Sequence, residues 1–367
     1  MTTRLGNADV LPPYEDHVRL WADELRAWVP DAVFDSHVHI GPPEAVGPIA
    51  PERRADALTT FMSLSWEELL DTHAALYSGK TIRGLVAVPF PQREVNGERA
   101  NDYIIEAMKR APRVQGFLVS EPTATRSAVA AFERALRAGV RFSGVKPYAD
   151  RLGKSNFEAT MAEFLPEDLL AFMERERLVM LLHTSGLGVV TEDVQNFLRR
   201  MADRYPHVRV LLAHMGRYVS DQQFLAFMDT DILATCPTLY LEMSSASCPE
   251  VYDRVLQCEW LHSRLLFGSD LPFGAITGVE HWSDTHGAIF LTRDTYAWSD
   301  HAMNAEFALQ RQRLTYNTYH CIQAFREALT RQGYGTAQAE RIKRDVFCGN
   351  ALRLFGCDPA GNTNCRT

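Results

Sequence analysis

The chain has 367 residues, of which 46% are hydrophobic and 23% are charged, a composition typical of globular proteins. Its formal net charge is −8, from 38 Lys and Arg against 46 Asp and Glu. This acidic balance argues against a nucleic-acid or membrane-surface binder, because both of those partners attract basic patches. The length is compatible with two domains or with one large α/β barrel, and we predict a single domain over residues 1–367.

Cysteine usage and the absence of long apolar runs predict a cytoplasmic protein. The seven cysteines include no CxxC pair and are odd in number, which favours free thiols in a reducing compartment. The N-terminal residues contain no apolar signal core, and no apolar run approaches the roughly 18 residues of a membrane helix. All of the cysteines lie in the last third of the chain, at positions 236, 248, 258, 321, 348, 357 and 365.

The first predicted element is a helix over residues 14–28. Val18, Trp21, Leu25 and Trp28 recur at helical spacing, so this helix should pack its apolar face on the main body.

From about residue 32, apolar strand-like runs alternate with helical segments. Most of these runs are continuously apolar, as expected for strands that are buried on both faces. Eight such strands favour a closed (β/α)8 TIM barrel over an open doubly wound sheet, and no GxGxxG or Walker A motif supports the open sheet. The predicted strands are 33–39, 82–89, 115–120, 140–147, 178–183, 208–214, 239–243 and 265–270.

The barrel should span residues 32–300, and helices over residues 302–356 should cover it. Because the first strand begins near residue 32, no separate β-sandwich domain is expected before it. Two long connections, 41–66 and 271–300, follow the first and eighth strands. Long loops at the carboxyl ends of barrel strands are typical substrate-contacting segments, although they can also be surface decoration.

Ionisable side chains stand at the carboxyl ends of four predicted strands. His37 and His39 are two apart, so both should face the barrel interior and could grip one metal ion. His183, His214 and Asp270 each directly follow an apolar run, where burial without a partner would be costly. The two histidines of a lone HxH motif can also be core residues whose hydrogen bonds are made within the protein. Four strand ends that meet in one barrel mouth instead favour a metal site. Histidines without this context, which we predict to be surface or structural, are His17, His73, His207 and His262.

This pattern of HxH, His, His and Asp on strands one, five, six and eight resembles the amidohydrolase superfamily. Further segments make it similar to the amidohydrolase-related branch of TIM-barrel hydrolases and nonoxidative decarboxylases. The resemblance covers residues 32–356 and includes Leu-Ala-His-Met-Gly at 212–216, Leu-Phe-Gly-Ser-Asp-Leu-Pro at 266–272 and Gly-Asn-Ala-Leu-Arg-Leu-Phe at 349–355.

The resemblance implies one or two divalent metal ions, and zinc, manganese and iron all suit this ligand set. His37, His39 and Asp270 would hold the first ion. His183 would bind the same ion in a mononuclear site, or a second ion together with His214 in a dinuclear site. Asp270 would also accept the proton of a metal-activated water, and His214 would polarise the substrate carbonyl in a mononuclear enzyme.

The resemblance also gives roles to three residues near these strand ends. Lys146 matches the lysine that CO₂ carboxylates in dinuclear members, where the carbamate bridges two metals; alternatively it faces a substrate carboxylate or a neighbouring acid. Arg217 could hold a substrate carboxylate through a bidentate contact, or it could be a solvated arginine at a helix start. We also place Tyr148, two residues after Lys146, among the substrate-binding residues.

Hydrolysis of an ester, lactone or amide of a small or medium organic acid is the predicted reaction, and nonoxidative decarboxylation of an aromatic acid is the first alternative. Glu242 stands where relatives often have an aspartate, and His286 lies in the connection 271–300; both are candidate additional ligands. Because carboxylates and imidazoles also suit iron, and a few similar barrels are dimetal oxygenases of natural-product pathways, a dioxygen-dependent diiron monooxygenase is the second alternative. A non-catalytic binding protein is the remaining one. The expected partner is a small-molecule substrate, and barrels of this branch often form homodimers.

Overall fold

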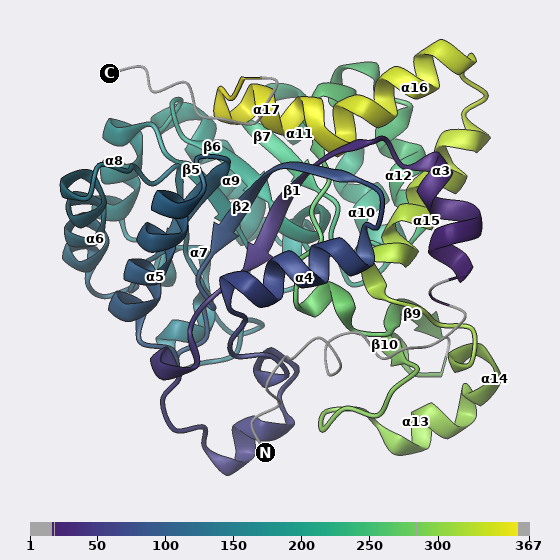
Figure 1. The fold of residues 1–367 in the computed structure, drawn as a ribbon, viewed down its shortest axis with the longest axis horizontal. Coiled ribbons are helices and arrows are strands. Elements are labelled where there is room, and N and C mark those ends of the chain that lie inside the picture. Colours follow the sequence, from purple (N-terminus) through teal and green to yellow (C-terminus); the bar gives the residue numbers. More distant parts are fainter. Residues whose placement is uncertain (1–16, 18, 284, 359–367) are drawn as a thin grey trace.

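The computed structural model describes residue 17, residues 19–283 and residues 285–358 (Figure 1). Eight parallel strands form one sheet in the order β1 to β8. Hydrogen bonds from Ser36 N to Phe267 O (3.0 Å) and from Asp270 N to His37 O (2.8 Å) bring the two edge strands together. The predicted (β/α)8 barrel is therefore confirmed. Its strands are β1 (Ala32–His39), β2 (Thr81–Val88), β3 (Val114–Val119), β4 (Gly144–Lys146), β5 (Val179–Leu182), β6 (Arg209–Leu212), β7 (Leu239–Glu242) and β8 (Leu265–Leu266).

Two apolar layers surround these strands. One lies inside the barrel, where alternating strand positions pack on one another; the other lies between the strands and the outer helices. Because strand side chains alternate between the two layers, almost every position of these strands is buried. The inner layer includes Phe34, Val86, Val88, Phe117, Val179, Leu181, Leu211 and Leu266.

Helices connect the strands, and several begin at sequence-encoded caps. Ser65 and Glu68 form a reciprocal capping box at the start of the first connecting helix. The connecting helices are α4 (Trp66–Leu76), α5 (Gly97–Arg110), α6 (Thr125–Arg137), α7 (Met161–Phe164), α8 (Glu167–Glu176), α9 (Glu192–Arg204), α10 (Asp221–Met228), α11 (Ile232–Thr235) and α12 (Pro249–Leu256).

Part of the predicted N-terminal helix is observed. A π-helical turn over Leu20–Leu25 continues into α3 (Arg26–Trp28), whereas residues 14–16 and 18 of the prediction lie outside the described residues. Trp21 stacks on Tyr319 with ring centroids 5.6 Å apart, so this helix packs against a C-terminal helix of the main body, as expected.

The C-terminal segment is helical, as predicted, and reaches the opposite end of the barrel from the hairpin described below (Figure 1). It comprises α13 (His301–Glu306), α14 (Ala308–Arg311), α15 (Asn317–Arg331), α16 (Thr336–Arg344), a π-helical segment Asp345–Gly349 and α17 (Asn350–Phe355). No helix of the described residues is long and apolar enough to cross a membrane. The cysteines of the described residues are free thiols, and Cys365 lies outside them.

The two long connections differ in structure. The connection after β1 folds into short 3-10 turns at Pro43–Ala45, Pro51–Ala55 and Ala57–Thr59. The connection after β8 contains an antiparallel hairpin, β9 (Gly278–Ser283) and β10 (Gly287–Thr292), which was not predicted. This hairpin supplies part of the wall of the cavity at the barrel mouth.

Candidate metal centre and substrate cavity

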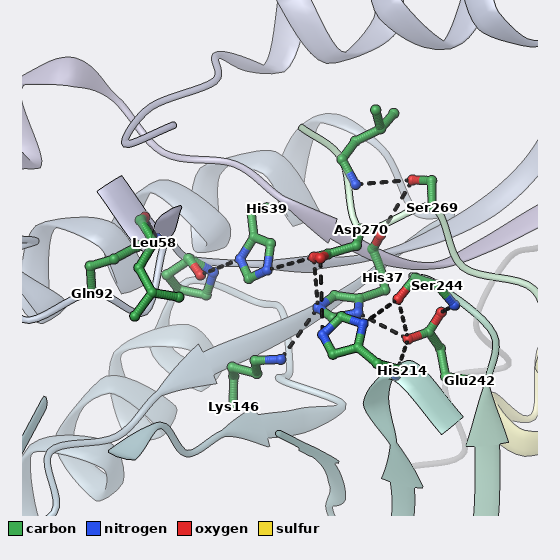
Figure 2. A network of polar contacts seen from close by, with 12 residues as sticks. His37, His39, Leu58, Gln92, Lys146, His214, Glu242, Ser244, Ser269 and Asp270 are labelled. Atoms are coloured by element: carbon green, nitrogen blue, oxygen red, sulfur yellow. Dashed lines mark hydrogen bonds and ion pairs between the residues drawn. The ribbon is translucent and has the colours of Figure 1, made fainter. Parts of the chain in front are cut away.

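Five of the predicted side chains, each at the carboxyl end of a strand, lie around one point (Figure 2). Asp270 Oδ1 lies 3.3 Å from His37 Nε2 and 3.1 Å from His39 Nε2. Lys146 Nζ approaches the same His37 nitrogen to 3.3 Å. His214 Nε2 lies 4.0 Å from the other oxygen, Asp270 Oδ2. Four strands therefore contribute to one compact cluster of nitrogen and oxygen atoms.

The backbone turns sharply where two of these side chains enter the cluster. His214 follows β6 with a φ of 56°, and Asp270 follows β8 with a φ of 55°. Non-glycine residues rarely adopt positive φ, and such strain is concentrated at functional sites. The same turn explains why β8 is shorter than predicted, since the chain leaves the sheet before Asp270.

The two histidines of β1 are oriented through their Nδ1 atoms. His39 Nδ1 donates to the carbonyl oxygen of Pro89 at 3.0 Å, and His37 Nδ1 donates to Glu242 Oε2 at 3.1 Å. With Nδ1 carrying the proton, Nε2 of each ring presents a lone pair to the cluster. Metal-binding histidines are held in this way by an acceptor behind the ring.

His214 is oriented in the same manner by a neighbouring strand end. Its Nδ1 donates to Ser244 Oγ at 2.8 Å, and Ser244 Oγ in turn donates to Glu242 Oε2 at 2.7 Å. The hydrogen bonds from His214 to Ser244 and from Ser244 to Glu242 therefore fix a third imidazole, with its Nε2 toward Asp270 (Figure 2).

Glu242, a candidate ligand from the sequence, lies behind the imidazoles at the end of β7. Besides His37 and Ser244 Oγ, its carboxylate accepts from Ser244 N at 2.6 Å and from His214 N at 3.3 Å. Gly268 lies against it, where a Cβ would come within 2.3 Å of Glu242 Oε1. Two groups of ligand atoms lie close enough to hold a metal ion: His37, His39 and Asp270; and His37, His214 and Glu242. The hydrogen bonds of Glu242 favour an orienting role for it.

The electrostatics of the cluster suit a cation. Burial raises the pKa of Asp270, but the His37, His39 and His214 imidazoles outweigh this effect and hold that pKa well below its usual range. Burial lowers the pKa of His37 and of His214. Neutral imidazoles beside an ionised carboxylate are the protonation states that metal binding requires. Asp270 Oδ1 is buried and has no hydrogen-bond partner among the described residues, which leaves an acceptor for a cation.

Lys146 is buried beside these ligand atoms, with 1% of its surface exposed. Burial lowers the pKa of its amine to about 8, an effect that Asp270 and Glu242 partly oppose. A considerable fraction of the side chain is therefore neutral near physiological pH, a prerequisite for reaction with CO₂. Its carboxylation stays a prediction.

The remaining predicted pocket residues lie on one side of the cluster. The His183 ring lies 5.4 Å from that of His214 and 5.0 Å from that of Tyr148, and all three line the cavity. His183 belongs to neither group of closely spaced ligand atoms. Arg217 also lines the cavity, where its Nη1 donates to the carbonyl oxygens of Gly186 (2.7 Å) and Thr184 (3.2 Å).

His286, the other candidate additional ligand, lies apart from the cluster. It is in the turn of the β9–β10 hairpin, and its Nε2 pairs with Glu306 Oε2 at 2.7 Å. Neither group of ligand atoms among the described residues includes it.

A cavity of about 660 Å³ opens in front of the cluster, large enough for a small organic molecule. Lys146, His214 and Asp270 form its polar end. Its other walls are largely apolar and include Leu58, Phe157, Leu187, Phe273, Ile276, Phe290 and Trp298.

Sequence reasoning missed Ser244, which orients His214, and it missed Tyr218 and Glu280 among the residues that line the cavity. The Glu-x-Ser spacing at 242–244 would have indicated Ser244, because residues two apart on a strand share a face. Glu280 could have been found only by recognising the hairpin in the connection after β8. No sequence signal singled out Tyr218.

The comparisons with known proteins agree with this architecture. A family model for amidohydrolases matches residues 34–357. The search of curated proteins found no match. Among solved structures, amidohydrolase 2 from Bifidobacterium longum subsp. infantis is similar with a TM-score of 0.51 and 16% identity, over 90% of this chain and 100% of that chain.

Two similar structures are decarboxylases. One is 2,6-dihydroxybenzoate decarboxylase complexed with 2,6-dihydroxybenzoate, with a TM-score of 0.50 and 15% identity over 89% of this chain and 99% of that chain. The other is dihydroxybenzoic acid decarboxylase from Polaromonas sp. JS666 with bound manganese and 2-nitroresorcinol, with a TM-score of 0.50 and 16% identity over 89% of this chain and 97% of that chain. At these identities the likeness concerns the fold. The family model, which spans most of the chain, shows that this protein belongs to the amidohydrolase family.

Proposed function

We propose that the protein is a metal-dependent hydrolase that acts on an ester, lactone or amide of a small or medium organic acid. The observation that carries this proposal is the common orientation of His37, His39 and His214. The Nδ1–H of each ring donates a hydrogen bond to an acceptor of the protein, and Nε2 of each ring lies toward Asp270. Three imidazoles and a carboxylate form a donor set that suits zinc, manganese or iron.

The residues present fit one divalent cation held by His37, His39 and Asp270, since the buried Asp270 Oδ1 has no hydrogen-bond partner among the described residues. Such a cation would supply Lewis-acid chemistry: it polarises a carbonyl group and acidifies a water molecule.

The side chains around this position supply the proton transfers. Asp270 stays ionised at neutral pH because of its lowered pKa, so its Oδ2 is available to accept a proton from the attacking water. His214 Nε2, 4.0 Å from this oxygen, presents its lone pair at the inner end of the cavity and can accept a hydrogen bond from the attacking water. The apolar walls exclude bulk water and strengthen these interactions.

Arg217 would bind a carboxylate of the substrate. Its Nη1 is fixed by two backbone carbonyls, whereas its Nε and Nη2 make no hydrogen bond with the described residues. A preorganised guanidinium on the cavity wall is a suitable partner for an organic acid.

The test measures metal content and reaction products in the same protein samples. Wild-type protein should bind a divalent metal and convert members of an ester, lactone and amide panel to products that have gained one water. His37→Ala combined with His39→Ala should lose both the metal and the activity. Asp270→Asn should keep most of the metal and lose about 100-fold or more in turnover. Full metal content in the double variant would contradict the proposed site.

Nonoxidative decarboxylation of an aromatic acid is a second candidate. Two proteins of similar fold carry this activity in their names, and Arg217 could orient a carboxylate. A diiron monooxygenase is a third candidate, because a second group of ligand atoms, from His37, His214 and Glu242, lies beside the first. Loss of CO₂ from an aromatic acid would indicate the second candidate, and substrate-dependent O₂ consumption would indicate the third.

A further inference from the structure

Two polar side chains on the cavity wall take no part in the proposed chemistry. Tyr218 follows the turn after β6, and Glu280 lies in the middle of β9. Both line the same cavity as His214 and Asp270. They come from different elements, so the fold and not their spacing in the chain brings them to one wall.

Both residues carry a buried polar atom without a partner. The Tyr218 hydroxyl and Glu280 Oε2 have no hydrogen-bond partner among the described residues, and only 7% of Tyr218 is exposed. Tyr218 lowers the pKa of Glu280 and Glu280 raises the pKa of Tyr218, so the two polar groups face one another on the cavity wall. Leaving such groups unsatisfied is costly, so their retention needs an explanation.

The surroundings of Glu280 hold it in place without satisfying its carboxyl group. Its backbone N–H donates to Ser247 Oγ at 3.3 Å, and Phe290 is its direct partner across the hairpin. Burial raises the pKa of Glu280 to about 8, and no ion pair with a cation of the described residues offsets that burial. Apolar neighbours on one side and an open cavity on the other leave a ligand as the partner for Oε2.

We propose that Tyr218 and Glu280 together bind a hydroxyl group of the substrate, whose reacting end lies at the metal centre. A hydroxyl group can accept a hydrogen bond from the Tyr218 O–H and donate one to Glu280 Oε2. An ammonium group has no lone pair for the Tyr218 O–H, and a carboxylate has no proton to donate to a lone pair of Glu280 Oε2. The substrate class is therefore an organic acid derivative with an apolar body and a hydroxyl group distant from the scissile bond. This inference rests on the proposed function, because it assumes that the cavity holds the substrate.

The turn after β6 supports the same assignment. His214, Met215 and Arg217 all have positive φ, and Gly216 between them has a φ of 85°. This strained segment presents His214 and Arg217 to the cavity, and Tyr218 comes directly after them. One short segment would thus supply contacts to the reacting end, the carboxylate and the hydroxyl group of a single ligand.

The test uses a series of phenylalkanoic acids that differ in chain length, each with and without a hydroxyl group at the para position of the ring. A third member of each set carries a para aminomethyl group. Dissociation constants are measured by calorimetry for the wild type, Tyr218→Phe and Glu280→Gln, with metal content determined for each sample. Phe290→Leu is the control for the cavity wall, and Tyr334→Phe is the control for loss of a phenol outside the cavity.

In the wild type, at one chain length the hydroxylated acid should bind about 10-fold more tightly than its unsubstituted partner. Tyr218→Phe and Glu280→Gln should each reduce this preference to about 2-fold or less, with unchanged metal content. Phe290→Leu should alter both acids equally, and Tyr334→Phe should alter neither. The proposal is overturned if no chain length shows the preference, if both variants retain it, or if the aminomethyl acid binds most tightly. If the wild-type protein contains no metal but still binds the hydroxylated acid more tightly, the proposed function is refuted and the hydroxyl-binding site is not.

Discussion

The orientation of the three imidazoles in the candidate metal centre depends on residues that do not themselves enter the cluster. Glu242 accepts hydrogen bonds from both His37 and Ser244, and Ser244 accepts from His214. Two of the three rings are therefore fixed through one carboxylate. An aspartate, shorter by one methylene, would not place its oxygens at the same points, which explains in structural terms why this chain has a glutamate there.

We propose that Lys146 decides whether the site holds one metal ion or two. If its neutral amine adds CO₂ and loses a proton, the resulting carbamate is an anionic ligand beside His37. Lys146→Ala should then bind fewer metal ions than the wild type, and formate or acetate should partly restore activity. Metal analysis and activity assays with added acids measure both effects. Unchanged metal content with a raised KM and rescue by small amines would instead identify a cationic lysine that binds substrate.

Glu280 should make stability depend on pH in a direction opposite to that of a salt-bridged carboxylate. Its pKa in the folded protein is about 8, whereas the pKa of a glutamate in the unfolded chain is about 4.3. Between these values the folded state binds the proton more tightly, so the contribution of Glu280 to stability is lost as pH rises through this window. Glu280→Gln should therefore be more stable than the wild type at pH 9, by up to roughly 5 kcal/mol, and similar to it at pH 4.

Urea unfolding of both proteins at the two pH values measures this difference. Glu133→Gln, a change at an exposed carboxylate, is the matched control and should follow the wild type at both. A constant difference between Glu280→Gln and the wild type would contradict a titrating Glu280.

At the scale of the elements, the close approach of β4 to its neighbours depends on a glycine. A Cβ at Gly144 would lie 2.3 Å from Val179 O in β5 and 2.4 Å from the Phe117 ring in β3. Because Val179 O belongs to the backbone of the sheet, it cannot move without breaking strand pairing. This approach allows three residues of strand to bring Lys146 to the barrel mouth.

Gly144→Ala should consequently destabilise the protein by about 3 kcal/mol or more. Gly335→Ala, at the start of α16, is the control: a Cβ there meets nothing within 4 Å, and its free energy of unfolding should change by no more than about 0.5 kcal/mol. Chemical denaturation of both variants measures the two changes. Equal stability of the two variants would show that the sheet accommodates the methyl group.

How far the sequence predicts this molecule differs between elements. The barrel followed from apolar runs that end in polar residues, and the convergence of His37, His39, His214 and Asp270 followed from parallel strands sharing one carboxyl edge. The β9–β10 hairpin was not predicted, and its polar residue Glu280 lines a cavity that exists only in the folded protein. The pairing of Nδ1 atoms with acceptors likewise depends on side-chain rotamers, which periodicity does not encode.

At the scale of the whole molecule, the two ends of the barrel have different tasks. The candidate metal centre and the cavity occupy the carboxyl ends of the strands, whereas α17 covers the other end. There Phe355 stacks on Phe34 with ring centroids 5.7 Å apart and contacts Phe117 at 6.1 Å. Leu354, only 2% exposed, packs on the same inner layer of the barrel. Covering the amino ends of the strands buries apolar side chains and contributes to stability, without touching the cluster.

Changes at the two ends should therefore separate stability from metal binding. Leu354→Ala should lower the free energy of unfolding by about 2–4 kcal/mol, because it leaves a cavity in a packed layer, and the folded variant should keep its metal. The combined His37→Ala and His39→Ala variant should fold but bind no metal. A ligand that binds only the folded state stabilises it. A chelator should therefore lower the Tm of the wild type and of Leu354→Ala by similar amounts. The Tm of the double histidine variant should stay unchanged. Calorimetric scans with and without chelator measure all three responses. If folded Leu354→Ala had lost its metal, the two ends would be coupled through the barrel interior and the separation proposed here would be wrong.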